Sequence, residues 1–202
     1  MIQWSHLVSV SSAQEMGTEY AIELIRLTIL NDKQRDRSRK YAVQDISLSI
    51  PKAGRTMIYG LPASGKTTIK RALFSPESYP EMVIVNSRLN ELLLKDSRDW
   101  STSDYEQKYA SRIGTGDFIV ADDPLDQAFE FLLNLKNALL VFAGVDGYQF
   151  INHFGHVAYL QRGQMVFSGH PREFWHWVKK TDPSELREFL LKYLVETGGD
   201  SD

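Results

Sequence analysis

Short apolar runs separated by polar turn residues dominate most of this chain. The two longest, Glu19–Leu30 and Tyr41–Ile50, predict a pair of antiparallel strands joined by a charged loop, and the second ends at Pro51. Shorter runs predict further strands at Arg55–Tyr59, Met82–Val85, Phe118–Ala121, Ala138–Phe142, Val157–Leu160 and Met165–Phe167. The pattern therefore predicts a protein rich in short, buried strands.

Helical spacing of apolar residues appears between several of these strands. It predicts helices at Leu89–Leu94, Leu125–Leu135 and Tyr148–Phe154, whereas Trp100–Asp104 is polar and turn-like. Strands that alternate with helices imply an α/β domain with a mainly parallel sheet covered on both faces. We expect residues 1–202 to form a single domain.

The end of the chain carries its own helix signals. Phe174–Trp177 predicts a short helix with an aromatic face, following His170-Pro171. Asp182-Pro183-Ser184-Glu185 then supplies an N-cap, a proline at the first helical position and an acidic residue in the first turn. Apolar residues follow at helical spacing, so residues 182–202 are expected to be a C-terminal helix with a frayed tail.

Composition narrows the function classes. The 202 residues carry a formal net charge of −3, which does not favour a nucleic-acid partner. Basic residues do gather between Lys33 and Lys40, but Asp32 and Asp36 interrupt them, which favours a solvated loop over a phosphate or lipid contact. There is no cysteine, so disulfides, thiol catalysis and cysteine-based zinc sites are excluded. No signal peptide and no long apolar span is evident, so we expect a soluble intracellular chain.

A phosphate-binding motif follows the strand predicted at Arg55–Tyr59. The run Gly60-Leu61-Pro62-Ala63-Ser64-Gly65-Lys66-Thr67 fits G-x-x-x-x-G-K-[ST] at every fixed position. In this motif, backbone N–H groups cradle phosphate oxygens, the lysine reaches the β- and γ-phosphates, and the hydroxyl binds Mg²⁺. The predicted nucleotide-binding residues are Gly60, Ala63, Ser64, Gly65, Lys66, Thr67 and Thr68.

A second half of such a site follows the strand predicted at Phe118–Ala121. Asp122 and Asp123 stand at its carboxyl end, where Asp122 could hold Mg²⁺ together with Thr67. Asp123 could polarise the attacking water as a general base, with Lys66 neutralising phosphate charge. An exposed acidic turn after a buried strand is the alternative interpretation of the two carboxylates.

Several of these segments together resemble the ATPases of ABC transporters. Asp45–Gly54 followed by the phosphate loop is similar to the opening of such an ATPase, and Val157–Gly169 is similar to its closing hairpin. Between them, Pro124-Leu125-Asp126 follows the acidic strand end, so the resemblance covers most of residues 20–178. Within the family, Arg39–Ile46 and Ser111–Gly114 resemble the ATPases of capsular-polysaccharide exporters.

The resemblance implies a fold and a set of partners. It implies a P-loop NTPase fold with an antiparallel β-subdomain, ATP and Mg²⁺ as cofactors, and a possible homodimer. It also implies an integral-membrane, permease-like partner, which would hold the chain on the cytoplasmic face of the membrane.

The chain departs from the family pattern in four ways. The interval from Lys66 to Asp122 is too short for most of the helical subdomain, and no LSGGQ-like signature is present. Asp123 stands where the family has a glutamate, and Ala143–Asp146 lacks the switch histidine. The parts that bind nucleotide are therefore intact, while those that serve hydrolysis are altered.

Two functions of different classes remain open. The first is the ATP-binding subunit of an ABC-type transporter, with polysaccharide as the expected cargo and slow hydrolysis. The second is a nucleotide-sensing regulatory or assembly subunit that does not hydrolyse ATP. A kinase built on the same loop would need basic lid residues, for which we find no convincing candidates in the sequence.

Overall fold

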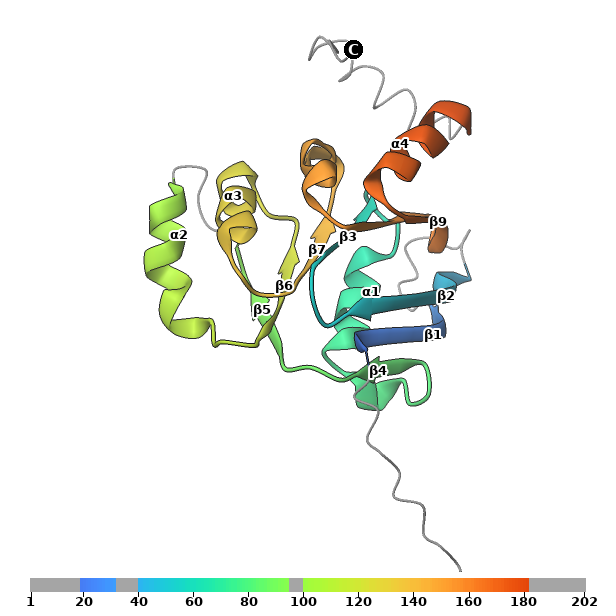
Figure 1. Cartoon of the computed structure of the whole chain (residues 1–202). Helices are drawn as coiled ribbons and strands as arrows, with labels where there is room; N and C mark the ends of the chain where they lie inside the picture. Colours follow the sequence, from blue (N-terminus) through green and yellow to red (C-terminus); the bar gives the residue numbers. More distant parts are fainter. Residues whose placement is uncertain (1–18, 32–39, 95–99, 182–202) are drawn as a thin grey trace, which may run out of the picture.

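A six-stranded sheet forms the centre of the computed structural model, which describes residues 19–31, 40–94 and 100–181. Its strands lie in the order β5-β6-β7-β3-β8-β9. Their bounds are Leu89–Leu92 for β5, Phe118–Asp122 for β6, Leu139–Ala143 for β7, Arg55–Gly60 for β3, His156–Gln161 for β8 and Gln164–Gly169 for β9. All neighbours are parallel except the β8–β9 hairpin, so the predicted mainly parallel sheet is confirmed (Figure 1).

A smaller antiparallel sheet lies beside the central one. It contains β1 (Tyr20–Leu30), β2 (Tyr41–Pro51) and β4 (Val83–Val85), in the order β2-β1-β4. β1 pairs with β2 in the antiparallel way that the sequence predicts. The run predicted at Met82–Val85 joins this sheet through β1, not the central one.

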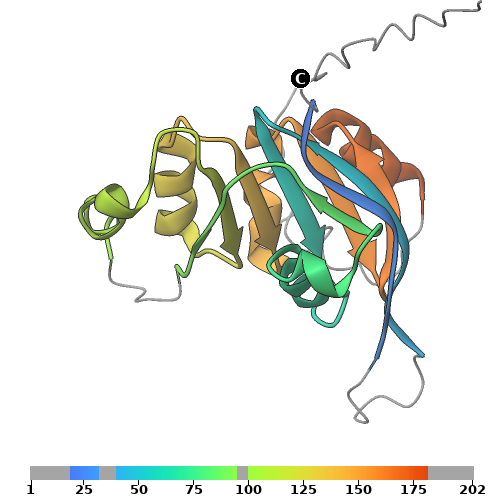
Figure 2. The same ribbon diagram turned by 90° about the horizontal axis from the view of Figure 1, so that it is seen from below.

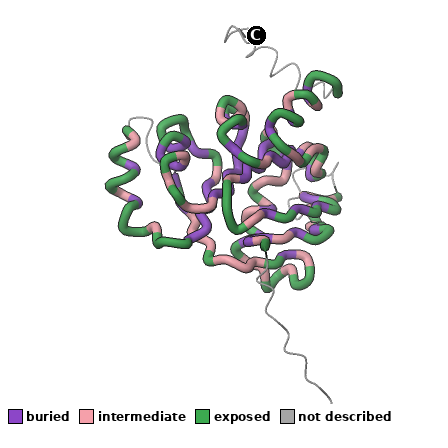
Figure 3. The backbone as a smooth tube through the Cα atoms, viewed as in Figure 1, coloured by how far each residue is buried: buried purple, intermediate pink, exposed green. Residues whose placement is uncertain are grey.

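Alternation along the central strands explains why the sheet is covered on both faces. In β3, Met57 and Tyr59 belong to the buried cluster beneath the helices α2 (Thr102–Tyr109), α3 (Asp126–Asn134) and α4 (Pro171–Lys180) and the 3-10 helix η3 (Val145–His153). Ile58 points the other way, into the cluster shared with α1 (Lys66–Leu73) and the antiparallel sheet. Figures 1 and 2 show these two layers on opposite sides of the sheet, and Figure 3 shows the buried stretches between them.

Two sequence predictions in this part of the chain were wrong. Leu89–Leu94 was predicted as a helix, yet Leu89–Leu92 is strand β5, because it pairs with β6 along its whole length. Trp100–Asp104 was predicted as a turn, yet Ser101 caps helix α2, with Asp104 completing a capping box. The 3-10 helix η2 (Ala110–Arg112) follows α2, and these are the helical elements described between β5 and β6.

The other helix predictions agree more closely with the structure. Leu125–Leu135 contains α3, Tyr148–Phe154 overlaps η3, and Phe174–Trp177 lies inside α4. The remaining short 3-10 helix is η1 (Pro76–Ser78). The helix predicted at 182–202 and most of the charged loop lie outside the described residues. In the part of the chain that the structure describes, no helix combines the length and apolar character needed to cross a membrane.

Candidate functional site

The phosphate-binding motif forms the connection between β3 and α1. β3 ends at Gly60 and α1 begins at Lys66, so the loop lies at the carboxyl edge of the parallel sheet. This is the edge at which ligands bind in open α/β sheets. Lys66 and Thr67 are the first residues of α1, where backbone N–H groups have no carbonyl one turn earlier in the helix. The loop therefore has the geometry that the motif predicts.

Two glycines are required by the space around the loop. A Cβ atom on Gly60 would lie 2.6 Å from the carbonyl oxygen of Leu160 on the neighbouring strand β8. A Cβ on Gly65 would lie 2.7 Å from Val43 Cγ1 and 2.9 Å from the carbonyl oxygen of Ala42, both on β2. Gly65 also has a φ of 108°, in the left-handed region that favours glycine.

The β8–β9 turn holds the loop from the other side. The Gly163 amide donates a hydrogen bond to the carbonyl of Ser64 at 2.9 Å. The Gly163 carbonyl in turn accepts a 2.8 Å hydrogen bond from the amide of Gln44 on β2. Gly163 of the β8–β9 turn thus joins the phosphate loop to strand β2 of the antiparallel sheet, and these contacts hold the loop in place.

Lys66 lies across its own loop. Its Nζ donates hydrogen bonds to the carbonyl oxygens of Gly60 at 2.5 Å and Leu61 at 3.1 Å. Burial lowers the pKa of Lys66, although the nearby carboxylates of Asp123 and Asp122 act in the opposite direction. The structure thus brings Lys66 close to Asp122 and Asp123, a consecutive pair that stands far from Lys66 in the sequence.

Asp122, the last residue of β6, has a cationic partner that the sequence analysis missed. Its Oδ2 lies 2.8 Å from Nζ of Lys70, and the same Nζ lies 2.9 Å from Glu91 Oε1 on β5. Burial alone would lower the pKa of Lys70, but its hydrogen bonds to Asp122 and Glu91 outweigh burial and raise that pKa. Lys70 follows Lys66 by one helical turn, so both lie on one face of α1.

These contacts also test whether the predicted Mg²⁺ ligands fit a metal ion. Thr67 is exposed at the start of α1. The Asp122 carboxylate already has a partly buried ammonium group as its counter-charge. A divalent cation there would lie beside a like charge in a site of reduced solvent access. With Lys70 in this position, Asp122 does not fit the role of a Mg²⁺ ligand. The metal role that the sequence predicts for Thr67 and Asp122 stays a prediction.

Asp123 is held in place by the end of the next strand. Its Oδ1 accepts a 2.8 Å hydrogen bond from the Gly144 amide, and its own amide donates to the carbonyl of Phe142 at 2.7 Å. Asp123 has a φ of 47°, a left-handed conformation that is uncommon for a residue with a side chain. A Cβ on Gly144 would lie 2.6 Å from that Oδ1, so a larger residue here would displace the Asp123 side chain. The role of Asp123 as a general base stays a prediction.

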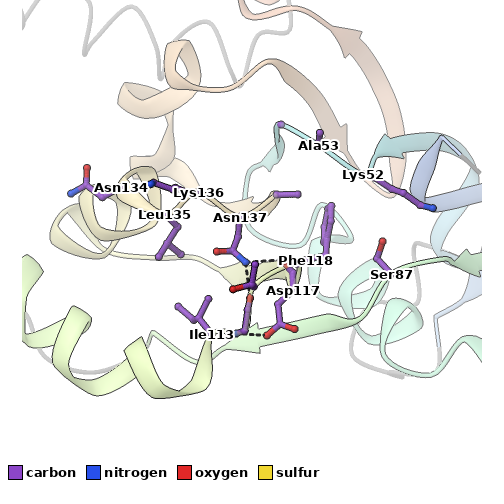
Figure 4. Close-up of a pocket in the computed structure, with 15 residues that line it drawn as sticks. Lys52, Ala53, Ser87, Ile113, Asp117, Phe118, Asn134, Leu135, Lys136 and Asn137 are labelled. Carbon is purple, nitrogen blue, oxygen red and sulfur yellow. Dashed lines mark hydrogen bonds between the residues drawn. The ribbon is translucent and has the colours of Figure 1, made fainter.

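A pocket opens at the amino edge of the sheet, opposite the phosphate loop (Figure 4). It has a volume of about 610 Å³, and Gly54, Asp117 and Asn137 are among its lining residues. Asp117 accepts hydrogen bonds from Asn90 Nδ2 at 2.9 Å and the Gly114 amide at 2.8 Å, and these bonds hold the pKa of Asp117 below its usual value. Asn137 donates to the carbonyls of Gly114 and Asp117. The polar groups here bond to one another, which indicates a structural role.

Comparison with known proteins gives a consistent fold. No family model and no curated protein matches the chain. Among solved structures, it is similar to a bacterial Atm1-family ABC exporter with ATP bound (TM-score 0.55, 11% identity), over 83% of this chain but only 41% of the exporter chain. It is also similar to the ATP-binding cassette MJ0796 in a dimeric post-hydrolysis state bound to ADP and Pi (TM-score 0.54, 13% identity), over 75% of this chain and 99% of that one.

A third similar structure is cbiO1 from Clostridium perfringens, part of the ABC transporter complex cbiONQ. The TM-score is 0.51 at 11% identity, over 87% of this chain and 99% of that one. At these identities the likeness shows the fold alone. The chain has the mixed α/β fold of ABC ATPase domains, with a mainly parallel sheet and an antiparallel sheet.

Proposed function

We propose that the chain binds ATP at the loop Gly60–Thr68 and serves as the nucleotide-binding subunit of an ABC-type transporter. One observation carries the proposal: a complete phosphate-binding loop stands at the carboxyl edge of a sheet with the fold of ABC ATPase domains. The backbone N–H groups at the start of α1 and the ammonium of Lys66 would neutralise the phosphate oxygens. Asp123, electrostatically coupled to Lys66, is the proposed general base.

The proposal extends to partners. An ABC-type subunit of this kind would act with an integral-membrane, permease-like subunit at the cytoplasmic face of the membrane, and could pair with a second copy of itself. MJ0796 is described as dimeric and cbiO1 as part of a transporter complex, which supports both ideas. Export of a polysaccharide rests on the short resemblances at Arg39–Ile46 and Ser111–Gly114.

A second candidate is a regulatory or assembly subunit that binds nucleotide without hydrolysing it. The contacts of the two carboxylates favour it. Asp122 is paired with Lys70, and one oxygen of Asp123 accepts the Gly144 amide, so both groups have partners within the protein. Positioning of water and of charge supplies most of the catalysis in phosphoryl transfer, so such contacts would slow turnover.

The deciding experiment measures ATP binding and steady-state hydrolysis for the wild type, Lys66→Ala and Asp123→Asn, with and without a membrane fraction. Lys66→Ala should weaken ATP binding about 10- to 100-fold, the scale of a lost hydrogen bond to a charged group. Lys52→Ala, an exposed lysine outside the phosphate loop, is the matched control and should leave binding unchanged.

The outcomes separate the candidates. Hydrolysis that requires both Lys66 and Asp123 supports the transporter subunit. Tight binding that requires Lys66, with no turnover under any condition, supports the regulatory subunit. A folded wild type that binds no ATP would contradict both.

A further inference from the structure

Lys70 joins three elements of the site through one ammonium group. It extends from α1, and its Nζ lies 2.8 Å from Asp122 Oδ2 on β6 and 2.9 Å from Glu91 Oε1 on β5. The Lys70 side chain is 13% exposed, and those of Asp122 and Glu91 are 21% and 29% exposed. The three charges therefore form a compact group with limited access to water.

The group places a positive charge where the sequence predicts a metal ion. Lysine is a compact point charge, and here it has two carboxylate partners instead of one. If Lys70 were displaced from Asp122, Glu91 would still hold it near the site. Mg²⁺ sheds its water reluctantly and demands regular octahedral coordination, so it competes poorly for a carboxylate that already has a charged donor.

The same ammonium group would favour a metal-free triphosphate. Asp122 and Asp123 lie near Lys66, and two carboxylates close to a phosphate loop repel an anionic ligand. Lys70 offsets the charge of Asp122 from within the protein. In other phosphate-loop proteins such an aspartate holds a Mg²⁺ ion, which neutralises charge on the phosphates.

We propose that the ammonium of Lys70 replaces Mg²⁺ as the counter-charge of Asp122, so that this chain binds nucleoside triphosphate without a divalent cation. The inference rests on the proposed nucleotide binding and deepens it, because it names the form of the ligand: the free triphosphate anion. Lys70 is a positioning and charge-balancing residue in this scheme and takes no part in bond making.

The test measures the dissociation constant of ATP in Mg²⁺ and in EDTA, for the wild type and three variants. The wild type should bind with equal affinity in both conditions. Lys70→Ala frees Asp122, and its affinity should become about tenfold or more higher in Mg²⁺ than in EDTA, the scale on which neighbours of a metal ligand alter metal binding. Adding Asp122→Asn to Lys70→Ala should abolish this Mg²⁺ dependence, which locates the metal at Asp122.

Glu91→Gln is the matched control. It removes one partner of Lys70 but leaves the ion pair with Asp122, so its affinity should stay independent of Mg²⁺. Circular dichroism of each variant checks that it folds, and the wild-type comparison is decisive even where a variant does not. A wild type that binds ATP about tenfold tighter in Mg²⁺ would overturn this inference while leaving the proposed function standing. A wild type that binds in neither condition would overturn both.

Discussion

Gly65 is the residue at which backbone conformation and crowding act together. Its φ of 108° disfavours any residue with a Cβ, and β2 leaves no space for that atom. Gly116 has a similar φ of 87°, but a Cβ atom added there would meet nothing within 4 Å, so this glycine separates the two effects.

Alanine at these two positions should therefore have unequal effects. Gly116→Ala should lower the free energy of unfolding by about 1–2 kcal/mol, the cost of a left-handed backbone. Gly65→Ala should lower it by about 1–3 kcal/mol more, because β2 must move to admit the methyl group. Chemical denaturation measures both values. Equal losses would mean that β2 yields freely and that the contacts at Gly65 contribute little.

The residues of the phosphate loop could be predicted from the sequence because they are close together in the chain and form one local motif. Gly60, Gly65 and Lys66 belong to one continuous segment, and the structure places that segment between β3 and the start of α1. Lys70 and Gly144 were missed. Their contacts with Asp122 and Asp123 depend on how α1 and β7 lie against β6, and the nearest signal in the sequence is the one-turn spacing of Lys66 and Lys70.

At the scale of elements, the local signal and the strand pairing disagree at one segment. The leucines of Leu89–Leu94 fit helical spacing, but the segment forms β5 because its backbone groups pair with β6. At α2 the sequence does contain a helix signal, the capping box of Ser101 and Asp104. Tyr105 and Tyr109 then pack on Phe131 of α3, with ring centroids 5.9 and 6.1 Å apart, which explains why this short helix is stable.

The β8–β9 hairpin contains a partly buried titratable residue, His156. Its burial makes the stability of the folded protein depend on pH. His156 begins β8, its Nε2 lies 3.0 Å from Ser168 Oγ on β9, and burial lowers the pKa of His156 below 6.5. The unfolded chain, with the ordinary pKa, takes up the proton more readily. The stability contributed by neutral His156 is therefore fully present above about pH 6.5 and is lost as pH falls through the lower folded pKa.

His156→Gln should remove this part of the acid sensitivity. Between about pH 7 and pH 5, the free energy of unfolding should fall less in the variant than in the wild type. His176→Gln, on the exposed side of α4, is the control and should follow the wild type. Parallel curves for wild type and His156→Gln would contradict the assigned cause.

At the scale of the whole molecule, the site joins α1 and the antiparallel sheet to the central sheet. The phosphate loop contacts β2 through Gly65 and the β8–β9 turn through Ser64, while α1 reaches β5 and β6 through Lys70. A ligand at this loop would therefore bind where elements of the central and the antiparallel sheet meet. Binding should therefore stabilise the whole domain.

Thermal unfolding measures this effect. ATP at about 100 times its dissociation constant adds about 2.7 kcal/mol of stability. For a chain of this size the melting temperature should rise by about 5–10 °C. At the same ATP concentration the rise should be much smaller in Lys66→Ala and unchanged in Lys52→Ala. No rise in the wild type at any ATP concentration would argue against binding at this loop.

The sequence by itself determined the phosphate loop, the antiparallel β1–β2 pair, the mainly parallel sheet and most of its strands. These depend on the order of residues and on alternation within short segments, which local physical chemistry governs. Only the tertiary structure decided that Leu89–Leu92 is a strand, that Lys70 neutralises Asp122 and that Gly144 holds Asp123. Each of these depends on strand order or on the rotation of a helix against the sheet. The packing of the whole chain determines the strand order and the helix rotation, so neither can be inferred from a short stretch of sequence.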